Sequence, residues 1–184
     1  MSSKINIWSI VMGHVGTMKD ASNGKVSIWD CITFFVFPAS VGLGFAILDV
    51  IVTDGANSML VNFGAIFTAL LLSVLVLVYD QGEKLGEITN EGKSLQVGLK
   101  KELLEQLYYN ICYSVVLSVF LVFLCLVYTF FPDEPFMVVF SDYVFELDAK
   151  RYFLSPLILM VVTNLLLTIL MVVKRMHTLL TIKI

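Results

Sequence analysis

Charged residues are scarce in this chain. Of its 184 residues only 15% are charged, whereas 58% are hydrophobic, and the mean hydropathy is +0.89. A soluble domain carries about a quarter charged residues, so this composition cannot build the surface of a water-soluble globular fold. The scarcity excludes a disordered or freely soluble chain and predicts a membrane protein. The net charge of −3 gives no sign of a nucleic-acid partner, and we expect no direct nucleic-acid binding.

Cysteine and histidine are also rare. Cys31, Cys112 and Cys125 share no short spacing, which predicts neither a disulfide framework nor a metal-binding knuckle. His14 and His177 have no Cys, Asp or Glu at ligand spacing. The chain contains no phosphate-binding glycine loop, nucleophile elbow or HExxH motif. We therefore expect no metal, no cofactor and no enzymatic activity.

Long hydrophobic runs, by contrast, are abundant. Four runs reach the length of about 20 residues that a helix needs to cross a bilayer: residues 28–52, 59–79, 108–131 and 152–173. Lipid offers no hydrogen-bond partner to a free amide, so these runs must be helical. The sequence therefore predicts an all-α membrane protein, a four-helix transmembrane bundle. The chain divides into a cytosolic amphipathic arm (1–27), transmembrane helices one and two (28–79), a cytosolic helical loop (80–107), transmembrane helices three and four (108–173) with an outer loop (132–151), and a cytosolic tail (174–184).

Lysine and arginine are distributed unevenly between the two ends of these helices. Ten of the twelve lie in the arm, the 80–107 loop and the tail, and the other two, Lys150 and Arg151, lie in the outer loop. The positive-inside rule places both termini and the 80–107 loop in the cytoplasm. In a bacterial host the chain is then a multi-pass protein of the cell inner membrane.

The amino-terminal arm carries an apolar stripe. Its residues are spaced three or four apart, which predicts a short amphipathic helix that rests on the lipid of the inner leaflet: Ile5, Trp8, Val11, Val15 and Met18.

The outer loop mixes apolar residues with carboxylates and is too short and too charged to span the membrane. It predicts a segment that lies on the outer surface or a loop that covers the ends of the bundle.

The first span combines a start signal with residues that interrupt a regular helix. Ser27 and Asp30 predict a helix cap at its beginning, and Pro38 predicts a kink. Small residues four apart in spans one and two predict that these two spans pair closely, while a gating hinge from Pro38 to Gly44 is an alternative. These pairs are Ser40 with Gly44, Gly42 with Ala46, Gly64 with Thr68, and Ala65 with Ala69.

Few polar side chains lie deep in the predicted spans, and none near the midplane is charged, which argues against a proton-coupled transporter. The deep polar residues are Ser114, Ser118, Thr163, Asn164 and Thr168. They are typical of helix packing or oligomer contacts. Alternatively, a ring of Asn164 side chains lines a pore in a symmetric assembly.

The 80–107 loop offers a candidate docking surface. From Ser94 onward, leucines at helical spacing predict a helix that continues into the third span. Its charged residues form the candidate site for a soluble partner: Lys100, Lys101, Glu102 and Glu105.

The layout of arm, four spans and polar middle loop resembles the small membrane subunit (KwaA) of the Kiwa antiphage defence system. The stretches that we compare are residues 14–20 (HVGTMKD), 27–30 (SIWD) with 37–38 (FP), and 110–113 (NICY). The resemblance covers most of the chain. It implies a homo-oligomeric inner-membrane protein that senses phage at the envelope and partners a cytosolic, DNA-binding effector of the same operon. The small membrane accessories of RNA-targeting CRISPR systems have a similar layout.

Two functions therefore fit the sequence. The first is a non-enzymatic, oligomeric inner-membrane scaffold or sensor subunit of a bacterial antiphage defence complex, which docks a cytosolic effector. The second is an oligomeric pore-forming effector, channel-like or holin-like, that depolarises the membrane.

Overall fold

The computed structural model describes residues 7–18, 27–89, 95–132, 134, 136–140 and 143–181. Its elements follow one another along the chain as a series of helices interrupted by one β-hairpin. They are α1 (Trp8–Gly16), α2 (Ile28–Cys31), the π-helical turn η2 (Ile32–Val36), α3 (Phe37–Ile47), α4 (Asp54–Thr89), α5 (Leu95–Phe130), β1 (Phe136–Phe140), β2 (Tyr143–Leu147), the π-helical turn η3 (Lys150–Leu154) and α6 (Ser155–Thr181).

Four helical segments are long and apolar enough to cross a membrane, as the hydrophobic runs predict. They are Ile28–Ile47, Asp54–Gly86, Gly98–Phe130 and Lys150–Thr181. Because lipid cannot satisfy backbone amides, each segment closes its hydrogen bonds within itself. The chain is therefore built as a multi-pass membrane protein.

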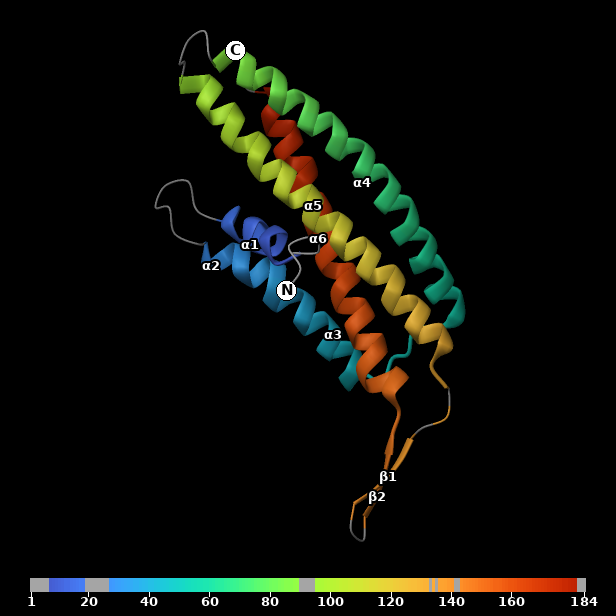
Figure 1. The fold of residues 1–184 in the computed structure, drawn as a ribbon. Helices are drawn as coiled ribbons and strands as arrows, with labels where there is room; N and C mark the ends of the chain where they lie inside the picture. Colours follow the sequence, from blue (N-terminus) through green and yellow to red (C-terminus); the bar gives the residue numbers. More distant parts are fainter. Residues whose placement is uncertain are drawn as a thin grey trace.

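The four segments form two packed pairs. Helices α4 and α5 run antiparallel and side by side along their length, α6 lies against α5, and α3 lies against α6 (Figure 1). One buried apolar cluster, which includes Leu121, Ile158 and Leu165, joins α5 to α6 near the hairpin end. A second, which includes Leu71, Leu107 and Val172, joins α4, α5 and α6 toward the opposite end.

The predicted pairing of spans one and two is wrong. On α3, a Cβ atom added to Gly42 would lie 2.7 Å from the carbonyl oxygen of Pro156 in α6. On α4, a Cβ atom added to Gly64 would lie 2.7 Å from a methyl group of Val122 in α5. The small residues do allow close approach, but span one meets span four and span two meets span three. The spacing of the small residues predicts which face of a helix makes a close contact, but it does not predict which helix that face contacts.

The first span ends earlier than its hydrophobic run. Helix α3 stops at Ile47, and Asp49, which belongs to the hydrophobic run 28–52, follows the helix with a positive φ of 56°. Its carboxylate forms an ion pair with Arg151 at 3.0 Å. The apolar residues that follow belong to the turn toward α4, so hydropathy alone overestimated the length of the helix.

Both backbone groups of Val52 hold this turn against the bundle. The Val52 amide donates to the hydroxyl of Ser155 at 3.1 Å, and the Tyr128 hydroxyl donates to the Val52 carbonyl at 2.5 Å. Val52 is itself buried. The turn between the first two spans is thereby fixed to α5 and α6, the helices that lie between them.

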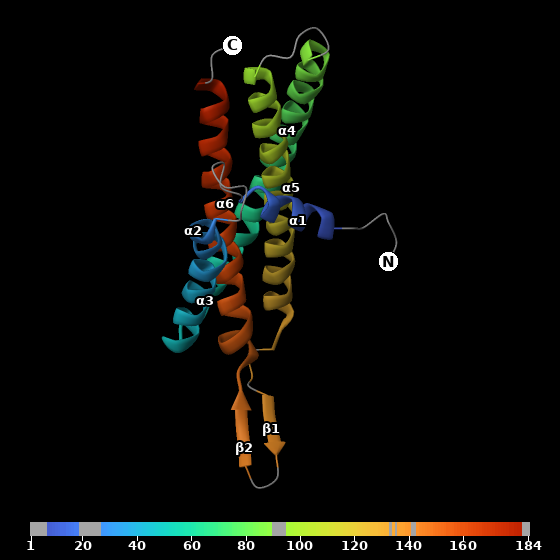
Figure 2. The ribbon, with the colours of Figure 1, turned by 90° about the vertical axis from the view of Figure 1, so that its left-hand side faces the viewer.

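The outer loop contains a β-hairpin that the sequence analysis did not predict. Strands β1 and β2 pair antiparallel, with Phe136 opposite Leu147 and Phe140 opposite Tyr143. Both views show the hairpin extending beyond the helix ends instead of covering them, which corrects the expected cap (Figures 1 and 2). Aromatic and β-branched residues on both sides of a two-residue connection favour a hairpin, in which each strand satisfies the other's backbone.

The contact of Gly42 with α6 gives a direct test of the observed pairing. We expect Gly42→Ala to lower the free energy of unfolding by about 1–3 kcal/mol, because the new methyl group forces α3 away from the Pro156 carbonyl. Gly44→Ala is the matched control, since a Cβ atom there meets nothing within 4 Å. Thermal unfolding in detergent measures both. Equal stability of the two variants would contradict the α3–α6 contact.

Candidate functional site

Helix α1 crosses α5 and is held there by buried polar groups. The two helices meet closely, since a Cβ atom on Gly13 would collide with the ring of Tyr109. His14 is fully buried, and its Nδ1 atom donates to the Asn110 side-chain oxygen at 2.8 Å. The Thr17 hydroxyl bonds to the same oxygen at 2.9 Å. The arm is therefore attached to a helix of the bundle, in addition to any contact that it makes with lipid.

The imidazole of His14 also connects the arm to the first span. Its ring stacks on Tyr113 of α5, with centroids 3.9 Å apart and planes 9° apart. The same ring meets the edge of Phe34 in η2 at 6.2 Å. His14 thus lies where α1, α5 and the start of the first span come together. Its Nε2 atom and the Asn110 amide nitrogen are buried without a hydrogen-bond partner.

A second interaction attaches the end of the arm to α6. The Arg175 guanidinium donates to the Thr17 carbonyl at 2.8 Å and to the Gln106 carbonyl of α5 at 3.4 Å. A guanidinium can donate several hydrogen bonds in one plane, so a single side chain can join three helices. Arg175 was counted only as a positive charge in the sequence analysis.

The amide of Asn164 lies at the centre of the packing between α6 and the first span. Its nitrogen donates to the Phe34 carbonyl at 2.6 Å. In an α-helix this carbonyl would accept the amide hydrogen of residue 38, but Pro38 has none. The side chain of Asn164 thus gives this carbonyl a partner beside the proline, and the Tyr113 hydroxyl donates to the Asn164 side-chain oxygen at 3.4 Å. The kink expected at Pro38 takes the form of the π-helical turn η2 just before it.

The other deep polar residues also have partners within the single chain. The Thr168 and Thr163 hydroxyls donate to carbonyls of their own helix, those of Asn164 and Leu159. Ser114 donates to the Asn110 carbonyl, and the hydroxyls of Ser118 and Thr68 bond across α5 and α4 at 2.8 Å. Of these bonds, the one between Ser118 and Thr68 joins two helices, and the other three lie within a single helix.

At the other end of the bundle, α4, α5 and α6 continue past their apolar runs as a packed unit. The helix predicted from Ser94 onward is confirmed as the first part of α5, and α4 continues to Thr89 opposite it. Val78, Leu104 and Leu107 are buried there, with Met176 and Leu179 of α6 packed against them. We call this unit the helical extension, comprising residues 80–89, 95–107 and 174–181.

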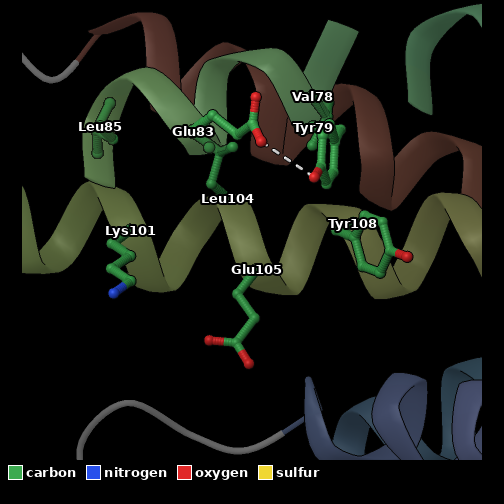
Figure 3. A pocket seen from close by; sticks show the side chains of 9 residues that line it. Val78, Tyr79, Glu83, Leu85, Lys101, Leu104, Glu105 and Tyr108 are labelled. Atoms are coloured by element: carbon green, nitrogen blue, oxygen red, sulfur yellow. Dashed lines mark hydrogen bonds between the residues drawn. The ribbon is translucent and has the colours of Figure 1, made fainter. Parts of the chain in front are cut away.

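The helical extension carries a groove of about 320 Å3 between α4 and α5. Figure 3 shows Leu104 between the two helices, with Tyr79 and Tyr108 at one end and Lys101 at the other. The Tyr79 hydroxyl donates to the Glu83 carboxylate at 3.1 Å, and Glu105 also lines the groove, with its carboxylate pointing away from α4 (Figure 3). The groove is apolar and aromatic inside and charged at its edge.

The four predicted docking residues do not share one face. Lys101 and Glu105 line this groove. Glu102 is exposed, accepts a hydrogen bond from Gln106 at 3.3 Å, and lines a separate cavity of about 350 Å3 between α1 and α5 that Glu105 also borders. Lys100 is only partly exposed. The candidate docking surface therefore consists of the groove and the adjoining α1–α5 cavity.

The role of His14, Asn110 and Tyr113 was missed from the sequence. One signal was present, because His14 lies three residues after Val11 and four before Met18, on the apolar face of the arm. A polar residue on an apolar face needs a buried partner. Nothing in the sequence indicated that Asn110, almost a hundred residues away, supplies it.

Among the described residues no three His, Cys, Asp or Glu side chains are grouped so that they could hold a metal ion. No protein family, curated protein sequence or solved structure matches this chain.

Burial gives His14 a specific pH dependence. Loss of hydration lowers the pKa of His14 from 6.5 to about 4; the bond to Asn110 opposes this change and Arg175 adds to it. The folded arm thus keeps His14 neutral where an unfolded arm would protonate it. The contribution of neutral, buried His14 to the free energy of unfolding is fully present above pH 6.5. It decreases as the pH falls toward 4, and at pH 5 the loss is on the order of 2 kcal/mol.

We expect the thermal midpoint in detergent to fall between pH 7 and pH 5, and His14→Gln to remove most of this decrease. His177→Gln is the control, because His177 is exposed on α6 and should leave the pH dependence intact. The same decrease in His14→Gln as in the unmodified chain would show that His14 is not the responsible group.

Proposed function

We propose that the chain is a non-enzymatic membrane scaffold or sensor subunit whose helical extension docks a soluble cytosolic protein. The observation that carries this proposal is the groove between α4 and α5 at the point where their apolar runs end. Its floor contains Leu104 and its rim contains Lys101 and Glu105. An apolar centre with a charged rim is the composition of a protein interface.

The size and rigidity of the helical extension support docking. At 1.5 Å per residue, residues 80–89 and 95–107 reach about 15–20 Å past the membrane-spanning runs. This is far enough to lie clear of lipid headgroups. Since Leu104 and Leu107 are buried in the extension, its helices are already ordered before a partner arrives, which lowers the entropic cost of binding.

The groove also indicates the chemistry of the partner. Two tyrosines, Tyr79 and Tyr108, border its apolar floor. Tyrosine is enriched among the interface residues that contribute most of the binding free energy. Glu83, Lys101 and Glu105 supply both signs of charge at the rim. The partner is then a protein that presents an apolar side chain flanked by charges of both signs, as an amphipathic helix does.

The cellular setting of the proposal follows from layout. Ten of the twelve basic residues flank the ends that carry the helical extension, and by the positive-inside rule this supports a cytoplasmic location for it. The resemblance to the Kiwa membrane subunit then suggests a homo-oligomer in a bacterial inner membrane, an effector of the same operon as the partner, and antiphage defence as the purpose. The β-hairpin would lie on the envelope side, where phage arrives.

The alternative, a pore, requires Asn164 to line a conducting path. Its amide bonds to the Phe34 carbonyl, and it is 7% exposed in the single chain. To line a pore, the Asn164 side chain would have to break that bond and turn toward a path between subunits. The scaffold needs no such rearrangement, and we prefer it.

A charge exchange in the docking surface tests the scaffold. Lys100→Glu, Lys101→Glu, Glu102→Lys and Glu105→Lys together leave the net charge unchanged and invert the local pattern. We expect the soluble protein that co-purifies with the chain from its native operon to be lost, while the thermal midpoint changes little, since surface substitutions usually cost within about 0.5 kcal/mol.

The control is the exchange of Asp80 and Lys84, an exposed pair 2.7 Å apart on α4 that does not line the groove. This exchange should leave the partner bound. If the fourfold variant retained the partner, the partner would not bind at this docking surface. A bilayer conductance that is present in the unmodified chain and lost in Asn164→Leu would favour the pore.

A further inference from the structure

A cavity of about 360 Å3 lies between the beginning of the first span and α6. Asp30 and Thr33 border it on one side, and Lys174 and Arg175 border it on the other. The volume is within the range of about 300–1,000 Å3 that ligand pockets occupy. The cavity is separate from the groove and from the α1–α5 cavity of the docking surface.

The α6 wall of this cavity changes from apolar to basic along the helix. Leu167, Leu170 and Met171 come first, followed within one turn by Lys174 and Arg175. Residues three and four apart share a helix face, so these side chains form one continuous strip. The apolar part lies inside the membrane-spanning run, and the basic part lies where that run gives way to the helical extension.

We propose that this cavity binds an anionic phospholipid, with the headgroup phosphate between Lys174 and Arg175 and an acyl chain along Leu170 and Met171. Basic pockets between transmembrane helices at the cytoplasmic side are suited to such headgroups. The order of the α6 strip, apolar and then basic, matches the order of acyl chain and phosphate in a lipid of the inner leaflet. A free phosphate ion would use the basic part alone.

The charges around the cavity favour an anionic lipid over a neutral one. Lys174 and Arg175 together carry two positive charges, and Asp30 carries one negative charge. The lining thus has one positive charge in excess, which one phosphodiester neutralises. The Lys174 ammonium has no hydrogen-bond or ion-pair partner in the part of the chain that the structure describes, whereas Arg175 is already bonded to two carbonyls. Lys174 is therefore the principal phosphate ligand.

Occupation of the cavity would reinforce the contact between the first span and α6. The lipid would touch Thr33 and Phe34 on one side and α6 on the other. It would also lie beside Arg175, whose bond to the Thr17 carbonyl holds the end of the arm. Binding should thus stabilise the folded chain in proportion to its affinity.

The test uses the full chain in nanodiscs of phosphatidylcholine, with and without phosphatidylglycerol. We expect phosphatidylglycerol to raise the thermal midpoint, and Lys174→Gln to increase several-fold the mole fraction needed for half of that rise. Lys174 is exposed and its side chain bonds to no described residue, so the variant should fold. Lys174→Arg should restore the response.

Lys101→Gln is the matched control, because it removes the same charge from the groove instead of the cavity. It should respond to phosphatidylglycerol as the unmodified chain does. Three results would overturn the proposal: equal midpoints in the two lipid compositions, an equal loss of response in Lys101→Gln and Lys174→Gln, or an equal rise with inorganic phosphate in phosphatidylcholine discs.

Discussion

The structure depends on one hydrogen bond that joins the fourth span to the first beside a proline. Pro38 has no amide hydrogen, so the Phe34 carbonyl lacks the partner that an α-helix would provide. Water is absent from the hydrocarbon region, and an unsatisfied carbonyl there costs several kcal/mol. Asn164 of α6 donates to this carbonyl at 2.6 Å. This bond holds the first span against the fourth and gives the deep amide of Asn164 a partner.

The same amide begins a series of contacts that reaches the arm. The Tyr113 hydroxyl donates to Asn164, the Tyr113 ring stacks on His14, and His14 bonds to Asn110. The position of the arm is thereby linked to the packing of the first span, and Arg175 adds a second link from the arm to α6. A partner that binds at the adjoining docking surface, or a lipid in the cavity beside Arg175, would act on this same junction.

Hydropathy was sufficient for the four spans, because the energy of placing each apolar run in lipid depends on composition and length. It was insufficient for their arrangement. Gly42 and Gly64 indicated close contacts, yet the identity of the facing helix depends on long-range matches such as Asn164 with Phe34. The hairpin was missed because a search for membrane helices ignores alternating aromatic and β-branched residues in a short loop. Of the four residues predicted to dock a partner, Lys101 and Glu105 line the groove, whereas the burial of His14 required Asn110 from another part of the chain.

The measurement that tests this account most directly is a double-mutant cycle of Pro38→Ala and Asn164→Leu, followed by unfolding in detergent. Asn164→Leu alone removes the buried hydrogen bond to the Phe34 carbonyl and should destabilise the chain by about 1–3 kcal/mol. Pro38→Ala restores an amide hydrogen to the first span, so in that background the loss of the Asn164 amide should cost less by about 1 kcal/mol. Thr163→Val, which removes only a bond within α6, should cost the same in both backgrounds. If the costs of Pro38→Ala and Asn164→Leu are additive, Asn164 does not compensate for the proline, and another interaction must hold the first span against α6.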